Sequence, residues 1–324
     1  MQGNEQIIRV IIVSFLIALF LGPVVIPVLK RLKVGQSIRE DGPKSHLVKS
    51  GTPTMGGIII ILAILISILT SGFFKAEIWA VIFFILGFGL IGFIDDYIKV
   101  VMRQNEGLKP MQKIIGQLIF SVLLALYGSK YSAMGTTLMI PFVNIHIDLG
   151  VLYIPFITFF AVGMVNAVNL TDGLDGLNTG VTMIVTAAFS LIANSLKDAN
   201  QIYEGISLIS AAVSGACLGF LRHNANPAKV FMGDTGSLAL GGAVAAVAVI
   251  SNTVLFIPII GGIYFAEALS VMIQVLHYKR TKRRVFKMAP LHHHYEMSGW
   301  KETKVVAVFW IASLILAFIG IYSI

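Results

Sequence analysis

Charged residues are scarce in this chain of 324 residues. Only 12% of the residues are charged, about half of the roughly 25% that is typical of soluble proteins. Hydrophobic residues make up 56%, and the mean hydropathy is +0.86, so the chain could not cover a large core with a polar surface. This composition excludes a soluble globular protein and a disordered one. It also excludes a chain that coats nucleic acid, despite the net charge of +8.

Cysteine is almost absent, because Cys217 is the only one in the sequence. A single cysteine excludes a disulfide framework and any zinc or iron–sulfur site that is built from thiolates. The sequence also lacks a repeat of fixed period and a low-complexity tract. Paired broken helices, as in an inverted-repeat transporter, cannot be matched between its two halves.

Long apolar runs are abundant. A helix needs about 20 apolar residues to cross a bilayer, and about ten such runs lie between charged or Gly- and Pro-rich breaks. We expect an all-α polytopic membrane protein that forms one integral domain over residues 1–324. The first run lacks a basic leader and a small-residue cleavage site, so we expect a span and not a cleaved signal peptide. The predicted spans are 6–28, 54–73, 78–98, 112–129, 151–169, 177–195, 205–221, 237–252, 254–277 and 304–323.

The basic residues predict the orientation of these spans. With ten spans and both termini outside, all 24 Lys and Arg residues fall in the inner loops except Arg9, Lys75, Lys130 and Lys197. Such a bias is the pattern expected of cytoplasmic loops. The longest outer connection, about 130–150, contains alternating apolar residues after a proline. It predicts a small β-hairpin on the outer surface, between helices four and five.

Two adjacent carboxylates end the third span. Asp95 and Asp96 repel each other at a membrane boundary, so a cation or a proton is needed nearby. Asp95 and Lys99 have the i,i+4 spacing of a helical ion pair. The alternative is an ordinary charged helix end that stops the span at the water interface.

A second polar group joins the fifth and sixth spans. Asn166, Asn169, Asp172 and Asp175 are spaced by three, so on a helix they would form one polar face. The glycines between them would let backbone approach a ligand closely. This loop contains no basic residue, so we expect its carboxylates to serve a function and not to balance local Lys or Arg. Helix capping would explain one Asp but not the whole set.

The third group, Gly233-Asp234-Thr235-Gly236-Ser237, opens the eighth span. Such a turn before a helix would point backbone N–H groups at a phosphate. Asp234 is suited to bind Mg²⁺, which prefers one or two carboxylates together with phosphate oxygens. A helix cap without a ligand is the alternative.

The last inner loop contains His292, His293 and His294. We expect these imidazoles to contact a phosphate, since a zinc site is weakly supported without Cys. Lys113 lies just inside the fourth span, where a lysine is costly. Glu267, inside the ninth span, is either a satisfied carboxylate between helices or a residue that lines the site.

These groups all fall on the predicted inner face. A transporter would place ionisable residues along a path near the midplane. Acidic groups for Mg²⁺ at the interface, together with Lys and His, favour phosphoryl transfer between a water-soluble anion and a lipid.

Together the motifs resemble those of the polyprenyl-phosphate N-acetylhexosamine-1-phosphate transferases, and within them the bacterial phospho-N-acetylmuramoyl-pentapeptide transferase family. The resemblance covers about residues 35–300. The Gly-Thr-Pro-Thr-Met-Gly-Gly and Pro-Leu-His-His-His strings point to the narrower family. The motifs are residues 51–57, 95–99, 166–177, 231–237 and 290–294.

The resemblance implies a homodimeric, Mg²⁺-dependent enzyme of the bacterial plasma membrane with its active site on the cytoplasmic face and no nucleic-acid partner. It would transfer phospho-MurNAc-pentapeptide from UDP-MurNAc-pentapeptide to undecaprenyl phosphate, giving lipid I and UMP. A sister transferase for GlcNAc-1-phosphate and, from another class, a transporter or flippase remain alternatives.

The resemblance also implies roles for residues. Asp95 would deprotonate or orient the lipid phosphate with support from Asp96, and Asp234 would bind Mg²⁺. A direct attack and a two-step route through an aspartyl-phosphate both fit. The candidate catalytic residues are Asp95, Asp96, Lys113, Asp234 and His293. The candidate substrate-binding residues are Lys49, Asn166, Asn169, Asp172, Asp175, Asn224, Phe231, His292 and His294, with Phe231 suited to stack on uracil.

Overall fold

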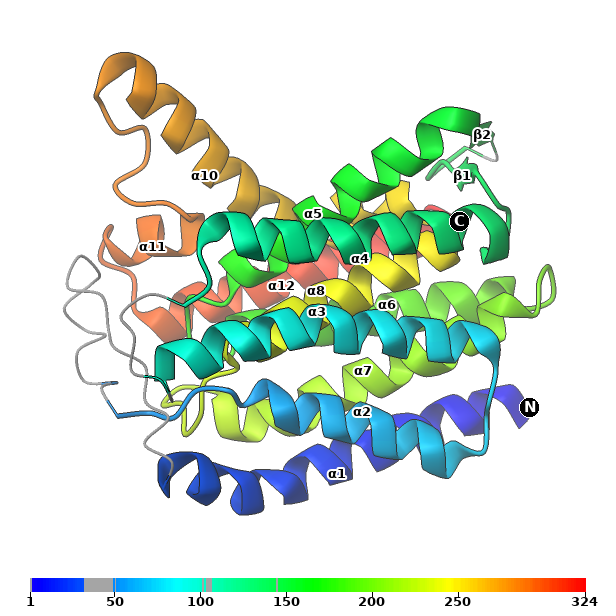
Figure 1. The fold of residues 1–324 in the computed structure, drawn as a ribbon, viewed down its shortest axis with the longest axis horizontal. Coiled ribbons are helices and arrows are strands. Elements are labelled where there is room, and N and C mark those ends of the chain that lie inside the picture. Colours follow the sequence, from blue (N-terminus) through cyan, green and yellow to red (C-terminus); the bar gives the residue numbers. More distant parts are fainter. Residues whose placement is uncertain (1, 32–48, 50, 101, 103–106, 144) are drawn as a thin grey trace.

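The computed structural model describes residues 2–324 except 32–48, 50, 101, 103–106 and 144. His46, which the sequence places among the basic residues of the first inner loop, lies outside the described residues. The described part is almost wholly helical, and its long helices run side by side as one bundle (Figure 1). The helices are α1 Gln2–Arg31, α2 Gly57–Ser71, α3 Ala76–Val100, α4 Pro110–Tyr131, α5 Tyr153–Thr171, α6 Leu177–Leu196, α7 Ile202–Asn224, α8 Gly233–Ile250, α9 Ile257–Ile260, α10 Gly262–Thr281, α11 Leu291–Glu296 and α12 Glu302–Tyr322.

The all-α polytopic architecture is confirmed. A helix occupies each predicted apolar run, and in the described part of the chain eight helices are long and apolar enough to span a membrane, or nine if α9 and α10 form one broken span. With 15 residues, α2 is shorter than each of these eight helices. At about 1.5 Å per residue it falls short of the roughly 30 Å hydrocarbon core. The count of ten spans therefore stays a prediction.

The ninth predicted span is not one straight helix, and the structure corrects that expectation. The segment that includes α9 and the following α10 bends by 84° at Gly261. Pro258 stands in the first turn of α9, Gly261 separates the two helices, and Gly262 is the first residue of α10. Glycines have little helix propensity, so they form a natural break. Beyond the bend, α10 extends away from the bundle (Figure 1).

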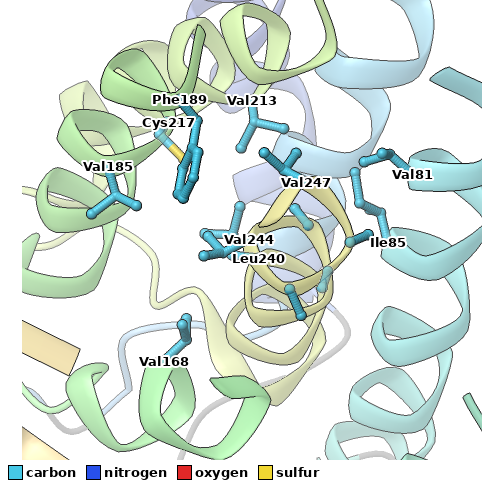
Figure 2. Close-up of a cluster of buried hydrophobic side chains, with 14 of the residues drawn as sticks. Val81, Ile85, Val168, Val185, Phe189, Val213, Cys217, Leu240, Val244 and Val247 are labelled. Carbon is cyan, nitrogen blue, oxygen red and sulfur yellow. The ribbon is translucent and has the colours of Figure 1, made fainter. Parts of the chain in front are cut away.

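Helix α8 lies at the centre of the bundle. All its residues from Thr235 to Ile250 are buried, and its apolar side chains pack against α3, α5, α6 and α7. Because it is rich in Gly and Ala, its neighbours can approach closely, as in other membrane helix pairs. Figure 2 shows this core, in which Leu240, Val244 and Val247 of α8 meet residues of the surrounding helices. Those residues are Val81 and Ile85 of α3, Val168 of α5, Val185 and Phe189 of α6, and Val213 and Cys217 of α7.

One glycine fixes how α3 crosses α8. A Cβ atom at Gly92 would overlap the Asp234 carbonyl group, so only glycine permits this approach. The contact lies one turn before the end of α3 that contains Asp95 and Asp96. The packing of the apolar core therefore brings the carboxylates of α3 beside the start of α8.

A small antiparallel sheet joins α4 and α5. Strands β1 Thr137–Met139 and β2 His146–Asp148 pair with Thr137 opposite Asp148, at the position where the sequence predicts a hairpin. Both termini and the two strands lie toward one end of the bundle, and α11 lies at the other (Figure 1). This arrangement agrees with the predicted sides, although which end faces the cytoplasm stays a prediction.

Candidate functional site

Three carboxylates converge where α3 ends and α8 begins. Asp95, Asp96 and Asp234 each offer an oxygen atom within 4.8 Å of the others. Asp95 is 2% exposed and Asp96 is 4% exposed, so bulk water screens neither carboxylate. Three acids this close cannot all be ionised without compensating positive charge or hydrogen bonds.

Asp96 binds the first turn of α8. The backbone N–H of Thr235 donates to Asp96 Oδ2 at 2.8 Å and the Thr235 hydroxyl donates to the same atom at 2.6 Å. The N–H of Asp234 donates to Oδ1 at 3.2 Å. The carboxylate of α3 thus caps α8 from outside. This corrects the expectation that these N–H groups point at a phosphate, because a protein carboxylate already accepts them.

Gly233 makes this cap possible. Its φ of +73° is a left-handed conformation that side chains rarely adopt. A Cβ atom there would also lie 2.6 Å from both Asp96 Oδ2 and Thr54 Oγ1. A larger residue would separate α8 from the two carboxylates of α3.

Asp234 is held by cations and an amide. Lys113 Nζ lies 2.9 Å and Lys99 Nζ lies 3.2 Å from Asp234 Oδ2. The Asn169 amide donates to Asp234 Oδ1 at 2.8 Å and to Ser237 Oγ at 2.7 Å. The structure thereby gives Lys113 the partner that a lysine at the edge of a span requires.

Asp95 also contacts Lys99. The expected i,i+4 ion pair between the two side chains is present, and Asp95 Oδ1 accepts the Leu108 N–H at 2.9 Å. Asp95 Oδ2 is buried and accepts no aligned hydrogen bond from the described residues, although the Lys99 ammonium lies against it. This oxygen of the cluster is therefore held by an ion pair and not by a regular hydrogen bond.

Asp172 and Asp175 do not share a helical face with Asn166 and Asn169, which corrects the sequence interpretation. Helix α5 ends at Thr171, and the chain turns through 172–176 before α6. Gly176 has a φ of +78°, which ends regular helix in this segment. Asp172 still faces the acidic cluster. Burial, followed by the negative charges of Asp234 and Asp96, raises the pKa of its carboxyl to about 8.

The acidic cluster fits a divalent metal ion. Among the described residues, the carboxyl groups of Asp95, Asp96, Asp172 and Asp234 face two ammonium groups, those of Lys99 and Lys113. Carboxylate oxygens are the ligands of hard divalent cations, and Asp95, Asp96 and Asp234 each bring one such oxygen to the cluster. The donor set therefore matches a metal such as Mg²⁺. The described residues form no second group of this kind.

A second network surrounds Asp175. Lys49 Nζ lies 2.7 Å from Asp175 Oδ1 and 2.6 Å from Glu302 Oε1. The Asp175 N–H donates to Glu302 Oε1 at 2.8 Å, and the Asn226 amide and the Ala228 N–H donate to Asp175 Oδ2. The network joins the segment before α2 to the starts of α6 and α12. The expectation that the acids of this loop balance no basic residue is therefore wrong for Asp175.

Glu302 is a participant that sequence reasoning missed. It opens α12, where an acidic residue is common because of the helix dipole. Its partner Lys49 is 253 positions away in sequence, so no local pattern links the two. Thr235 and Gln117 were missed for the same reason.

The segment before α2 pairs with the segment before α8. The Phe231 N–H donates to the Pro53 carbonyl at 2.8 Å, and the Gly56 N–H donates to the Phe231 carbonyl at 2.9 Å. These bonds fix the backbone of Phe231 and leave its ring half-buried. Asn224 is 3% exposed. Its amide donates to the Val230 carbonyl at 3.0 Å, and its oxygen accepts the Thr179 hydroxyl at 2.6 Å.

Asn166 lies one helical turn before Asn169 and pairs with α4. Its amide and that of Gln117 exchange hydrogen bonds of 2.7 and 3.3 Å. A reciprocal amide pair is an efficient way to satisfy polar groups inside a membrane bundle. The structure thus places Asn166 at a helix contact beside the cluster.

The histidine run forms α11, and each ring has a different environment. His292 is 0% exposed, with Nδ1 3.0 Å from Glu267 Oε2. His293 Nδ1 lies 2.8 Å from Glu296 Oε2. His294 Nδ1 accepts the Lys287 N–H at 3.1 Å. In the described part of the chain these rings join no cluster of three metal ligands, so the structure gives the zinc alternative no support.

Two groupings therefore emerge from the predicted site residues. Asp95, Asp96, Lys113, Asn169, Asp172 and Asp234 surround one acidic cluster. Lys49 and Asp175 share the second network, and Asp172 in the same loop links the two. Asn166, Asn224 and the histidines bind other parts of the protein at this end of the bundle.

Comparison with known proteins identifies the family of this chain. The model of glycosyl transferase family 4 matches residues 78–252, and signature 1 of phospho-N-acetylmuramoyl-pentapeptide transferase matches residues 49–61. The chain is 55% identical to the phospho-N-acetylmuramoyl-pentapeptide-transferase of Alkaliphilus metalliredigens, over 100% of this chain and 99% of the relative. It is 52% identical to that of Clostridioides difficile over 100% and 99%, and 51% identical to that of Bacillus velezensis over 98% of each chain.

Proposed function

Because this chain belongs to the phospho-N-acetylmuramoyl-pentapeptide transferase family, we propose that it transfers phospho-MurNAc-pentapeptide from UDP-MurNAc-pentapeptide to undecaprenyl phosphate. The products are lipid I, for peptidoglycan synthesis, and UMP. The observation that supports this most directly is the convergence of Asp95, Asp96 and Asp234 with two lysines at one end of an apolar bundle. A membrane-bound lipid and a soluble nucleotide would meet at such a place.

The reaction exchanges one phosphoanhydride bond for another. A lipid phosphate oxygen attacks the β-phosphorus of the donor, and the bond between that phosphorus and the bridging oxygen breaks. UMP leaves with the electron pair. Such transfers depend mainly on positioning and on neutralising charge. A two-step route through an aspartyl-phosphate also fits the same residues.

Asp234 and Asp95 would hold Mg²⁺, with Asp96 completing the negative site. Bound there, the ion would neutralise phosphate charge. Lys113 and Lys99 lie beside Asp234, which suits them to bind the oxygens of the diphosphate. Asp95 is the residue that orients the lipid phosphate or takes its proton at Oδ2.

The remaining predicted residues would bind the donor. Asn169 and Asp172 border the acidic cluster, and Phe231 offers an aromatic face to uracil. Asp175 and Asn224 would act by holding the shape of their loops, because their polar atoms bind protein groups. Lys49, Asn166 and the three histidines lie at the same end and would contact the sugar-phosphate or support those that do.

We further propose that residues 1–324 form one integral domain in the bacterial plasma membrane, with this end on the cytoplasmic side. The inner concentration of Lys and Arg supports that orientation. A homodimer is expected from the family. Cross-linking in native membranes tests the dimer, and labelling of single cysteines from either side of sealed vesicles tests the orientation.

Purified protein with undecaprenyl phosphate and either UDP-MurNAc-pentapeptide or UDP-GlcNAc tests the function. We expect Mg²⁺-dependent UMP release and a lipid-linked product with the first donor only. A lipid-linked product from UDP-GlcNAc alone would identify the sister transferase instead. Substrate movement across sealed vesicles without UMP release would identify a transporter.

A further inference from the structure

Glu267 and His292 form a pair that is buried from every side. Both residues are 0% exposed, and they come from α10 and α11. Glu267 Oε2 lies 3.0 Å from the ring nitrogen Nδ1 of His292, and Glu267 Oε1 accepts the His292 backbone N–H at 3.2 Å. One carboxylate therefore binds both the ring and the backbone of the same residue.

Such a double contact fixes the ring in orientation and in tautomer. A carboxylate can accept a hydrogen bond but cannot donate one, so Nδ1 must be the protonated nitrogen. In the neutral ring Nε2 is then left as an acceptor. A carboxylate that binds the far nitrogen of an imidazole orients the near one in many metal sites and in the catalytic triad.

His292 Nε2 is directed at the loop of the candidate site. The nitrogen is buried and has no hydrogen-bond partner among the described residues. A Cβ atom at Gly173 would overlap it, so the ring occupies the space that a side chain at 173 would need. Gly173 directly follows Asp172 and lies two positions before Asp175. The ring thus supports the loop that joins the acidic cluster to the Lys49 network.

A purely structural histidine would be expected to use both nitrogens. An unpaired buried polar atom destabilises the folded protein, and such atoms in native proteins call for a specific explanation. Here the unpaired atom faces a loop whose acidic residues border the proposed donor site.

We propose that Glu267 is a positioning residue for the transfer reaction, acting through His292. It holds the ring against Gly173 so that the Asp172–Asp175 loop takes the shape that binds the nucleotide-sugar donor. The inference rests on the proposed function and adds a residue inside the membrane bundle to its machinery.

Glu267→Gln tests the pair because it keeps the side-chain volume. A glutamine offers one acceptor oxygen where the carboxylate offers two, so it can accept the ring N–H or the backbone N–H of His292 but not both. We expect the catalytic efficiency toward the UDP-linked donor to fall by about 10–100-fold, as for other residues that orient a functional side chain. This loss should come mainly from a higher KM for the donor. The KM for undecaprenyl phosphate should stay within about 2-fold of the wild-type value.

Glu77→Gln is the matched control. Glu77 is also buried, at 8% exposure, but lies at the start of α3, at the far end of that helix from Asp95 and Asp96. We expect it to leave both KM values unchanged. A loss equal to that of Glu267→Gln would show a general sensitivity to buried glutamates and would overturn the proposal.

A glycine pair tests the loop contact independently. Gly173→Ala would push the His292 ring away and should raise the donor KM as Glu267→Gln does. Gly163→Ala, on α5 with nothing within 4 Å of its added Cβ, should not. Equal behaviour of the two alanine variants would contradict the contact.

Double variants decide whether Glu267 acts through His292. If it does, Glu267→Gln combined with His292→Gln should be no worse than His292→Gln alone, whereas additive losses would overturn the proposal. Nitrogen-15 NMR of labelled histidine should show His292 protonated at Nδ1 in the wild type, and a ring protonated at Nε2 instead would also overturn the proposal.

A variant that replaces both Glu267 and His292 distinguishes loss of the proposed role from failure to fold. Glu267→Met with His292→Leu removes the polar pair together, which is often tolerated, so this protein should fold but keep the reduced activity. Full activity in that variant would overturn the proposal. Wild-type protein that releases no UMP would instead refute the proposed function itself, so the two failures are distinguishable.

Discussion

Asp96 of α3 receives both the backbone N–H and the hydroxyl of Thr235, at 2.8 and 2.6 Å, across 139 positions of sequence. A carboxylate that caps a neighbouring helix couples two tasks. It satisfies N–H groups that the helix itself leaves unpaired, and it keeps one negative charge beside Asp95 and Asp234. Stability and activity should therefore respond together to changes at Asp96.

Asp96→Asn should lower both the melting temperature and the activity. An asparagine can accept at one atom only, and its amide group would face the N–H donors of α8. An unsatisfied buried donor costs about 1–3 kcal/mol. Thermal unfolding in detergent and UMP release check this, with the exposed Asp148→Asn at the β1–β2 sheet as control. A normal melting temperature would argue against the capping role.

Asp95→Asn and Asp234→Asn should each reduce turnover by orders of magnitude while the protein still inserts. Both remove a charged oxygen from the proposed metal site. Chelation should abolish wild-type UMP release, and added Mg²⁺ should restore it. Calorimetric titration with Mg²⁺ should show weaker binding for Asp234→Asn. Near-normal turnover in both variants would refute the roles given to these residues.

Lys49→Met should be more harmful than Glu302→Gln. Removing the lysine leaves Asp175 and Glu302 facing each other without a cation, whereas removing one carboxylate keeps the Lys49–Asp175 pair. We expect Lys49→Met to raise the donor KM at least about 10-fold and Glu302→Gln to raise it less. The opposite order, measured by steady-state kinetics, would show that Glu302 and not Lys49 organises the network.

Asp172 makes stability depend on pH. Its folded pKa of about 8 lies above the ordinary value of 3.8, so between these values the folded protein binds a proton that the unfolded chain has lost. Stability from this group therefore falls as pH rises from about 4 to about 8. In the absence of divalent cations, Asp172→Asn should make that slope shallower. Melting temperatures at pH 5 and pH 8 check this, and an identical slope in wild type and variant would contradict it.

The sequence predicted the parts of the site that depend on local pattern. The apolar runs became helices because length and hydrophobicity decide a span, and Asp95 pairs with Lys99 because helical spacing requires it. Lys113 could be singled out because a lysine at that depth needs a partner. Which carboxylate it meets depends on the α3–α8 crossing, which no local pattern encodes.

The errors have a common physical origin. The Thr235 N–H looked free to bind a phosphate because its partner Asp96 is 139 residues away. Asp175 looked as if it had no basic partner because Lys49 is 126 residues away. The prediction of one helical face through Asp172 and Asp175 was wrong because α5 ends at Thr171, before both residues. The bend at Gly261 was missed because the residues around it are as apolar as those of an unbroken span.

Gly92 lies against the carbonyl group of Asp234, with no space for a single methyl group between the two helices. The separation of the reacting carboxylates is therefore set inside the bundle and not by the loops around it. Substrate need not assemble this part of the site, since its geometry exists beforehand. The free energy of substrate binding can then serve to orient the donor and the lipid. A substitution deep in the apolar crossing should slow the chemical step even though it touches neither substrate.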